Sequence, residues 1–340
     1  MANIMMTDAC NLACPYCFAN EFVNKDRNYI SKESFDEAVS FITGDGSHDV
    51  VGIIGGEPTL HPQFEEMMRS LIVNTRVRGI MLYTNGLLMD RFWDVCAHPK
   101  MHMLINCNPP ENIGKANYEH LCRNLDTLLI DKLCIDRVTL GINMYKPDFE
   151  YMYIIELLRK YDFHHVRVSI TVPNMDTQRN LDAHGYFQIM KPRLMDFFHA
   201  LMKNDVLPNF DCNKIPYCLL TKEEMQEFAG YMNQPFIHDH YQESNISHNR
   251  VLCRPVIDIR QDLTAVRCFG LSETTKENIR DFRCIKDLEN YYLRTVDAYA
   301  YNTVYSSKCI DCYERKTMNC TGGCLAFKIA EINRLQEHAI

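Results

Sequence analysis

Three cysteines near the start of the chain have the type and spacing of iron–sulfur or metal ligands. Cys10, Cys14 and Cys17 follow the pattern Cys-x3-Cys-x2-Cys. Three thiolates this close together can hold three irons of a [4Fe–4S] cluster and leave the fourth iron open to a small ligand. A zinc site would need a fourth Cys or His nearby, and the nearest histidine is His48. We therefore favour an iron–sulfur cluster over a stray cysteine group or half of a zinc site.

A second motif follows a predicted buried strand. Residues 50–54 are apolar and mostly β-branched, and they lead directly into Gly55, Gly56, Glu57 and Pro58. Paired glycines at a strand end indicate a turn where the backbone comes close to a ligand. Alone, this turn would be ordinary. Its position about forty residues after the cysteines makes it informative, because both motifs then end strands of one fold.

The two motifs together resemble the signature of the radical S-adenosylmethionine (radical SAM) superfamily. In that superfamily the open iron of the cluster chelates the methionine end of S-adenosylmethionine (SAM), and the Gly-Gly-Glu-Pro motif binds the methionine amino group. The resemblance implies that Cys10, Cys14 and Cys17 hold such a cluster and that residues 55–58 contact the cofactor. It also implies reductive cleavage of SAM to a 5′-deoxyadenosyl radical, which abstracts hydrogen from a substrate C–H bond.

The first 205 residues alternate strand-like and helix-like segments, which predicts an α/β fold with a parallel sheet and right-handed crossovers. The expected strands are 3–7, 50–54, 79–84, 102–107, 137–143 and 165–172. The expected helices are 31–42, 62–74, 90–97, 117–130, 149–161 and 186–204. Ligands of such folds gather at the carboxyl ends of the strands, where both motifs fall. The family resemblance sharpens this to a (β/α)6 partial barrel, the radical SAM core, over residues 1–205.

Other strand ends supply further candidate cofactor contacts. Thr84-Asn85-Gly86 closes the third strand and resembles a Thr-Asn-Gly often found there in this superfamily. Amides can hydrogen-bond ribose hydroxyls or adenine edges, and an arginine can pair with the cofactor carboxylate. For each of these single residues, a turn-forming or surface role is an open alternative. The candidates are Thr84, Asn85, Asn106, Asn108, Asn143 and Arg167. No catalytic side chain is assigned.

The segment 206–340 is rich in cysteine and is predicted to be a second, smaller domain. Its last four cysteines form Cys-x2-Cys-x7-Cys-x3-Cys, a pattern that fits zinc and iron–sulfur equally well on its own. Behind a radical SAM core it resembles the SPASM extension, which binds auxiliary [4Fe–4S] clusters. The resemblance implies an opening ligand pair, Cys253 and Cys268. The full set of cysteines here is Cys212, Cys218, Cys253, Cys268, Cys284, Cys309, Cys312, Cys320 and Cys324.

This segment departs from the SPASM pattern at three points. Leu263 stands where a glycine is usual, the spacer is x7 in place of x5, and no cysteine follows Cys324. Cys212, Cys218 or Cys284 would have to complete the ligand sets of two auxiliary clusters. A single auxiliary cluster, as in the shortened twitch domain, is the alternative. The remaining cysteines, Cys96, Cys107, Cys122 and Cys134, fall in core elements and are expected to be small buried hydrophobes.

Composition agrees with a cytoplasmic protein that binds iron–sulfur clusters. The formal net charge of −8 argues against a nucleic-acid binder, because there is no surplus of basic residues to replace phosphate counterions. No apolar run is long enough for a membrane span, and no signal peptide precedes Cys10. Sixteen cysteines in a long chain without a signal indicate cluster ligation in a reducing compartment. His238-Asp239-His240 could bind a metal, but chance placement in a polar loop is the simpler interpretation.

The resemblance favours modification of a peptide or protein, with oxidation of a small molecule such as a sugar or nucleoside as the alternative. Only nine residues precede Cys10, so we expect no leader-binding domain there. A flavodoxin or ferredoxin would supply electrons. A non-enzymatic iron–sulfur electron carrier or redox sensor is the remaining alternative. Residues 55–58 argue against it, since such a protein needs no site for a cofactor amine.

Overall fold

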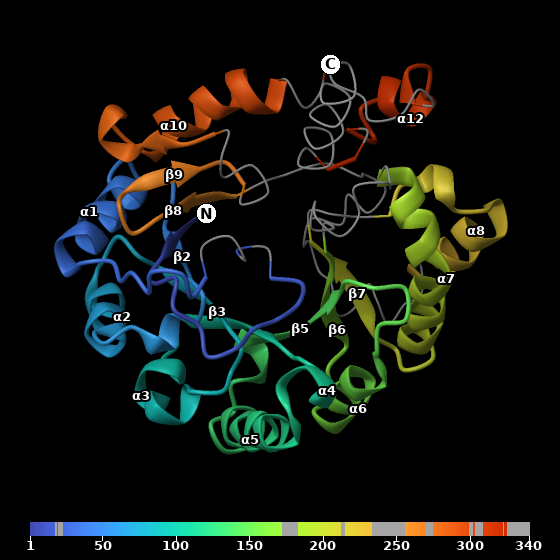
Figure 1. Cartoon of the computed structure of the whole chain (residues 1–340), viewed down its shortest axis with the longest axis horizontal. Helices are drawn as coiled ribbons and strands as arrows, with labels where there is room; N and C mark the ends of the chain where they lie inside the picture. The colour runs from blue at the N-terminus through green and yellow to red at the C-terminus, as the bar shows by residue number, and fades with distance from the viewer. Residues whose placement is uncertain are drawn as a thin grey trace. The chain divides into compact units, whose positions relative to one another are not determined.

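The computed structural model describes residues 1–17, 19, 23–171, 183–211, 215–232, 256–268, 275–298, 302, 309–321 and 323–324 (Figure 1). The chain divides into two compact units. The first comprises Met1–Gly141 and Pro255–Asp297, and the second comprises Ile142–Arg254 and Ala298–Ile340. This division reflects which parts of the chain pack together. The functional division at residue 205 stays a prediction.

The first unit is built on a mostly parallel sheet. Its strands lie in the order β10-β9-β8-β1-β2-β3-β4-β5, and neighbours from β8 to β5 are parallel. The strands from the N-terminal part of the chain are β1 (Ala2–Met5), β2 (Val50–Ile54), β3 (Gly79–Thr84), β4 (Met101–Asn106) and β5 (Val138–Met144). The helices between them are α1 (Lys32–Thr43), α2 (Phe64–Val73), α3 (Trp93–Cys96), α4 (Pro110–Ile113) and α5 (Lys115–Asp126).

The sequence forms these elements for simple reasons. Strand β2 is buried from Val51 to Ile54, and Val51, Ile53 and Leu82 of β2 and β3 are fully buried, as expected for a parallel sheet covered by crossover helices. Helix α1 begins at a Ser31 cap, whose side chain accepts the Ser34 N–H, as its serine and acidic first turn predict. Cys96, Cys107 and Cys134 are buried and Cys122 is half-buried, in line with the expectation for core thiols.

A hairpin of two strands, a further short strand and a helix from the later part of the chain complete the first unit. They are β8 (Ile257–Ile259), β9 (Thr264–Val266), β10 (Glu277–Asn278) and α10 (Ile285–Tyr292). Strand β8 runs parallel to β1, and β9 returns antiparallel to β8. The turn between them places Leu263 at φ +65°, a left-handed conformation that favours glycine.

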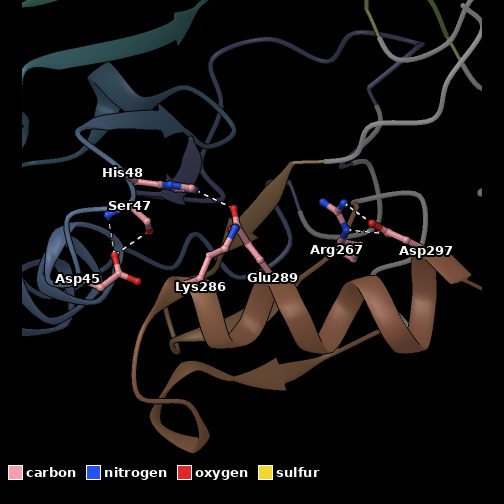
Figure 2. A network of polar contacts seen from close by, with 7 residues as sticks. All are labelled: Asp45, Ser47, His48, Arg267, Lys286, Glu289 and Asp297. Atoms are coloured by element: carbon pink, nitrogen blue, oxygen red, sulfur yellow. Dashed lines mark hydrogen bonds and ion pairs between the residues drawn. The ribbon is translucent and has the colours of Figure 1, made fainter.

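Polar contacts join α10 and the hairpin to their surroundings (Figure 2). Glu289 of α10 places its carboxylate 2.8 Å from His48 Nε2 and 3.0 Å from Lys286 Nζ. Arg267, just after β9, forms a two-pronged ion pair with Asp297, with N–O distances of 2.9 and 2.7 Å. Both partners of that pair are largely buried, and the pair ties the end of β9 to the residue that closes this segment. The His48–Glu289 contact joins α10 to the N-terminal part of the first unit.

The second unit continues the strand–helix alternation. The last residues of β5 belong to it, and β6 (His165–Ile170) pairs in parallel with β7 (Leu207–Phe210). Its helices are α6 (Met152–Lys160), α7 (Ala183–Met202), α8 (Lys222–Met232) and the short α12 (Tyr313–Lys316).

The predicted α/β fold with a largely parallel sheet is confirmed. All six expected strands and all six expected helices are present, with ends displaced by a few residues. In the ranges that the structure describes, no helix is long and apolar enough to cross a membrane.

Candidate functional site

The three N-terminal cysteines lie in a loop that follows β1, which we call the cysteine loop (residues 8–17). All three thiols are partly exposed. The Cys17 N–H donates to the Cys14 carbonyl at 3.1 Å, and the Leu12 N–H points at the Cys10 sulfur at 3.4 Å. Among the described residues no three His, Cys, Asp or Glu side chains stand in metal-ligand geometry, so the loop would have to close further around a cluster.

The turn at residues 55–58 is clamped against the start of the cysteine loop. The Gly56 N–H donates to the Thr7 carbonyl at 2.7 Å, and the Glu57 N–H donates to the Ala9 carbonyl at 2.8 Å. A Cβ on Gly55 would lie 2.6 Å from the Thr7 oxygen, and one on Gly56 would lie 2.4 Å from the Ala9 oxygen. The approach of a ligand was the expected reason for these two glycines. In the structure, the chain that approaches them is the protein's own.

Glu57 is a buried carboxylate that ties two strand ends together. Its Oε1 accepts the Thr59 hydroxyl at 2.6 Å, the Thr59 N–H at 3.2 Å and the Thr84 hydroxyl at 2.8 Å. Its Oε2 accepts the Asn85 N–H at 2.8 Å. Burial raises the pKa of the Glu57 carboxyl, and these hydrogen bonds oppose that shift. Pro58 opens the short 3-10 turn that carries Thr59.

Asn85 links the same turn to the cysteine loop. Its side-chain amide donates to Asn11 Oδ1 at 2.8 Å, across 74 residues of sequence. The structure therefore brings together three predicted segments: the cysteine loop, the Gly-Gly-Glu-Pro turn and the Thr84-Asn85-Gly86 turn. Asn11 and Thr59 were missed by sequence analysis, although each stands beside a motif that was recognised.

The electrostatics of the cysteine loop fit a cationic iron cluster. The pKa of the Cys10 thiol is raised to about 12, chiefly by burial and then by repulsion from Glu57, Cys14 and Cys17. Burial also raises the pKa values of the Cys14 and Cys17 thiols. Three thiolates and a buried carboxylate so close together are unfavourable without a positive partner, which the irons of a [4Fe–4S] cluster supply. The residues present therefore suit that group.

Of the other candidate cofactor contacts, Asn106 and Asn143 lie at or beside strand ends, and Arg167 lies within β6. Asn106 ends β4 in the first unit, half-buried. In the second unit, Arg167 Nη1 donates to Asn143 Oδ1 at 3.0 Å, and its Nη2 contacts Asp211 Oδ2 at 2.5 Å. Asp211, which sequence analysis missed, thus partly neutralises the arginine that was expected to pair with a cofactor carboxylate.

Two of the later cysteines belong to the first unit. Cys268 lies two residues beyond β9, and the β8–β9 register (Asp258↔Val266) places it opposite residue 256, close in sequence to Cys253. Cys284 is the N-cap residue of α10, and its side chain hydrogen-bonds Asp45.

The remaining described cysteines belong to the second unit. Cys312 is the N-cap residue of α12, and the Cys320 N–H donates to the Glu314 carbonyl at 3.0 Å. Cys309 and Cys324 flank this segment. Cys218 is exposed, with its sulfur 3.8 Å from His184 Nε2. Cys212, Cys253 and His238–His240 lie outside the described residues.

Comparisons with known proteins agree on the N-terminal part. Residues 4–128 match the family model described as Radical SAM superfamily. GTP 3′,8-cyclase from Synechocystis sp. is 33% identical over 92 residues, which cover 27% of this chain and 28% of that protein. GTP 3′,8-cyclase from Chlorobaculum tepidum is 31% identical over 91 residues, covering 27% of each. The chain therefore matches little more than a quarter of the length of these curated relatives.

Solved structures agree over nearly the whole chain. Streptococcus suis SuiB bound to S-adenosylmethionine has a TM-score of 0.59 at 16% identity, over 95% of this chain and 72% of that one. SuiB bound to the precursor peptide SuiA has a TM-score of 0.60 at 14% identity, over 95% and 71%. At these identities the likeness is one of fold.

Proposed function

Because the N-terminal part of this chain is a radical SAM domain, we propose that the protein cleaves S-adenosylmethionine reductively and abstracts hydrogen from a substrate C–H bond. One observation carries the proposal: the cysteine loop, residues 55–58 and Thr84-Asn85 form one hydrogen-bonded site at adjacent strand ends. A bound [4Fe–4S] cluster and SAM would supply the electron and the 5′-deoxyadenosyl radical.

The chain's own residues would hold and orient these groups. Cys10, Cys14 and Cys17 would bind three irons. Residues 55–58 would meet the methionine end of SAM while they keep the cysteine loop in place through the Thr7 and Ala9 carbonyls. Further proposed contacts are Thr84, Asn106, Asn143 and Arg167. Arg167 would have to share its guanidinium between Asp211 and the cofactor.

We also propose that the later cysteines bind one or two auxiliary [4Fe–4S] clusters, in a functional domain that spans 206–340. The proposed ligands are Cys253, Cys268, Cys309, Cys312, Cys320 and Cys324, with Cys212 or Cys218 completing a second set. Cys284 is less suitable because it stands at the N-cap position of α10 and its thiol contacts Asp45.

Iron analysis tests the cluster assignment. At four irons per cluster, the reconstituted protein should hold about twelve Fe with two auxiliary clusters and about eight with one. The variant that combines Cys10→Ala, Cys14→Ala and Cys17→Ala should retain about eight or about four. Zinc bound in place of iron at Cys309–Cys324 would refute the auxiliary clusters and leave the radical SAM domain.

For the substrate, we propose a peptide or protein. The fold shared with SuiB along 95% of the chain supports this choice. The sequence similarity to GTP 3′,8-cyclases favours the alternative, a small molecule such as a nucleoside or sugar, but it covers only the radical SAM part. A flavodoxin or ferredoxin would be the electron donor.

Deuterium transfer separates the two substrate classes. A precursor peptide encoded near the gene would be prepared in deuterated form and incubated anaerobically with the reconstituted enzyme, SAM and dithionite. Deuterium in 5′-deoxyadenosine would support the proposal. Its absence with every neighbouring peptide, together with transfer from a deuterated nucleoside or sugar, would establish the alternative.

A further inference from the structure

Both polar atoms of the Asn85 side chain have hydrogen-bond partners within the protein. Its Oδ1 accepts the Leu87 N–H at 3.0 Å, which leaves the amide nitrogen facing Asn11, whose Oδ1 it meets at 2.8 Å. The backbone hydrogen bond fixes the orientation of the amide, because an oxygen must face the Leu87 N–H. Asn85 is only 9% exposed. Its polar atoms are thus directed at the turn and at the cysteine loop.

The turn that carries Asn85 is held on two sides. Glu57 accepts the Asn85 N–H from one side. From the other side, Asn124 of α5 donates its side-chain amide to the Gly86 carbonyl at 2.8 Å. Gly86 has φ +77°, and a Cβ there would lie 2.7 Å from a Leu121 methyl group. The turn is therefore a fixed point from which the Asn85 amide reaches the loop.

On the loop side, the contacts surround Cys10. The residue before it, Ala9, accepts the Glu57 N–H at 2.8 Å. The Cys10 N–H itself donates to Asn24 Oδ1 at 2.8 Å. The residue after it, Asn11, is exposed and receives the Asn85 amide. The Asn85–Asn11 bond thus anchors the loop on the side leading to Cys14 and Cys17.

We propose that Asn85 is a positioning residue for the cysteine loop, which it holds through Asn11, and that this is its role in place of direct contact with SAM. The inference deepens the proposed function, since the loop it positions is the one that would bind the cluster. It also reassigns Asn85, which sequence analysis grouped with the cofactor contacts. Glu57 supports the same arrangement by fixing the Asn85 backbone.

Thiol alkylation of the cluster-free full-length chain tests this proposal. Each cysteine would be followed by mass spectrometry during exposure to iodoacetamide in wild type, Asn11→Ala, Asn85→Ala and the double variant. We expect Cys10 and Cys14 to react roughly three- to tenfold faster in each single variant, the factor for one lost hydrogen bond. The double variant should be no faster than the faster single variant, because both changes break the same bond.

Three controls define the outcome. Asn11→Asp keeps the acceptor and should not react faster than wild type, because its added negative charge opposes formation of the Cys10 thiolate. Asn117→Ala removes an exposed amide of α5 that donates to the Ile113 carbonyl at the end of α4, away from the cysteine loop in sequence, and it should also react like wild type. The buried Cys96 should stay protected in every variant. If Cys96 becomes reactive in Asn85→Ala, that variant has unfolded. The test then rests on Asn11→Ala, because Asn11 is exposed and its replacement should leave the fold intact.

The proposal is overturned if Asn11→Ala leaves alkylation at the wild-type rate, or if the two single effects multiply in the double variant. These measurements require neither cluster nor SAM, so they stand even if the proposed function fails. In the reconstituted protein, SAM titration followed by EPR adds a second readout. A variant Asn85→Ala with wild-type thiol reactivity but weakened SAM binding would make Asn85 a cofactor ligand.

Discussion

Replacing Gly56 by alanine probes the contact between the Gly-Gly-Glu-Pro turn and the cysteine loop. The new Cβ would lie 2.4 Å from the Ala9 oxygen, 2.7 Å from the Ala9 carbonyl carbon and 2.9 Å from the Asp8 oxygen. Ordinary carbon contacts are about 3.5 Å. All three atoms belong to the backbone, so no side chain can rotate away. The two segments must separate by roughly 1 Å.

That separation breaks or stretches two short hydrogen bonds, from Gly56 N–H to Thr7 and from Glu57 N–H to Ala9. Each is worth about 1 kcal/mol net, and more if its buried groups stay unpaired. Overpacking adds about 1–3 kcal/mol. We therefore expect Gly56→Ala to lower the free energy of unfolding by roughly 3–5 kcal/mol, as the combined estimate.

Urea denaturation of the cluster-free protein measures this loss directly. The matched control is Gly230→Ala in α8, where an added Cβ meets nothing within 4 Å. This change should be neutral or stabilise the helix by up to about 1 kcal/mol, because alanine is the better helix former. A Gly56→Ala protein as stable as wild type, with normal cluster uptake, would refute the close approach of the two segments.

Three further predictions concern the first unit. Burial lowers the pKa of His61, whose ring accepts the Gln63 N–H, so folding favours the neutral imidazole. The stability of the folded protein should therefore rise with pH up to about 6.5. His61→Gln should weaken that rise in melting curves recorded at different pH values. A variant whose stability depends on pH as steeply as that of wild type would contradict the assignment to His61. Tyr292→Phe should cost about 1–3 kcal/mol, because the buried hydroxyl contacts two backbone carbonyls; a neutral result in denaturation would contradict those bonds. Leu263→Gly should remove the strain of a left-handed backbone, about 1–2 kcal/mol, but lose the buried leucine side chain, which contributes about 1.5–3 kcal/mol. We therefore expect a less stable protein, and a stabilised variant would show that the backbone strain is the larger effect.

The sequence predicted the parallel part of the fold well because its evidence is local. Buried strands such as 50–54 and 79–84 are short apolar runs followed by turn residues, and helices such as α1 carry their own cap. The hairpin of β8 and β9 was missed for the opposite reason. Its strands have three residues each, and β8 pairs with β1, which is about 250 residues away in sequence.

The candidate site shows the same contrast. Cys10, Glu57 and Thr84 were recognised because they stand in compact motifs with a known chemical purpose. The polar partners that hold those motifs together, such as Asn11 and Asp211, left no local signal. A single asparagine or aspartate in a loop has many possible roles, and only the tertiary structure brings it to its partner.

The central claim is that Cys10, Cys14 and Cys17 support reductive cleavage of SAM. The most direct measurement is the formation of 5′-deoxyadenosine after anaerobic reconstitution with iron and sulfide, in the presence of SAM and dithionite. Wild type should form 5′-deoxyadenosine, while the triple alanine variant should form none and still bind any auxiliary cluster. Undiminished SAM cleavage by the triple variant, or none by a fully reconstituted wild type, would contradict the claim.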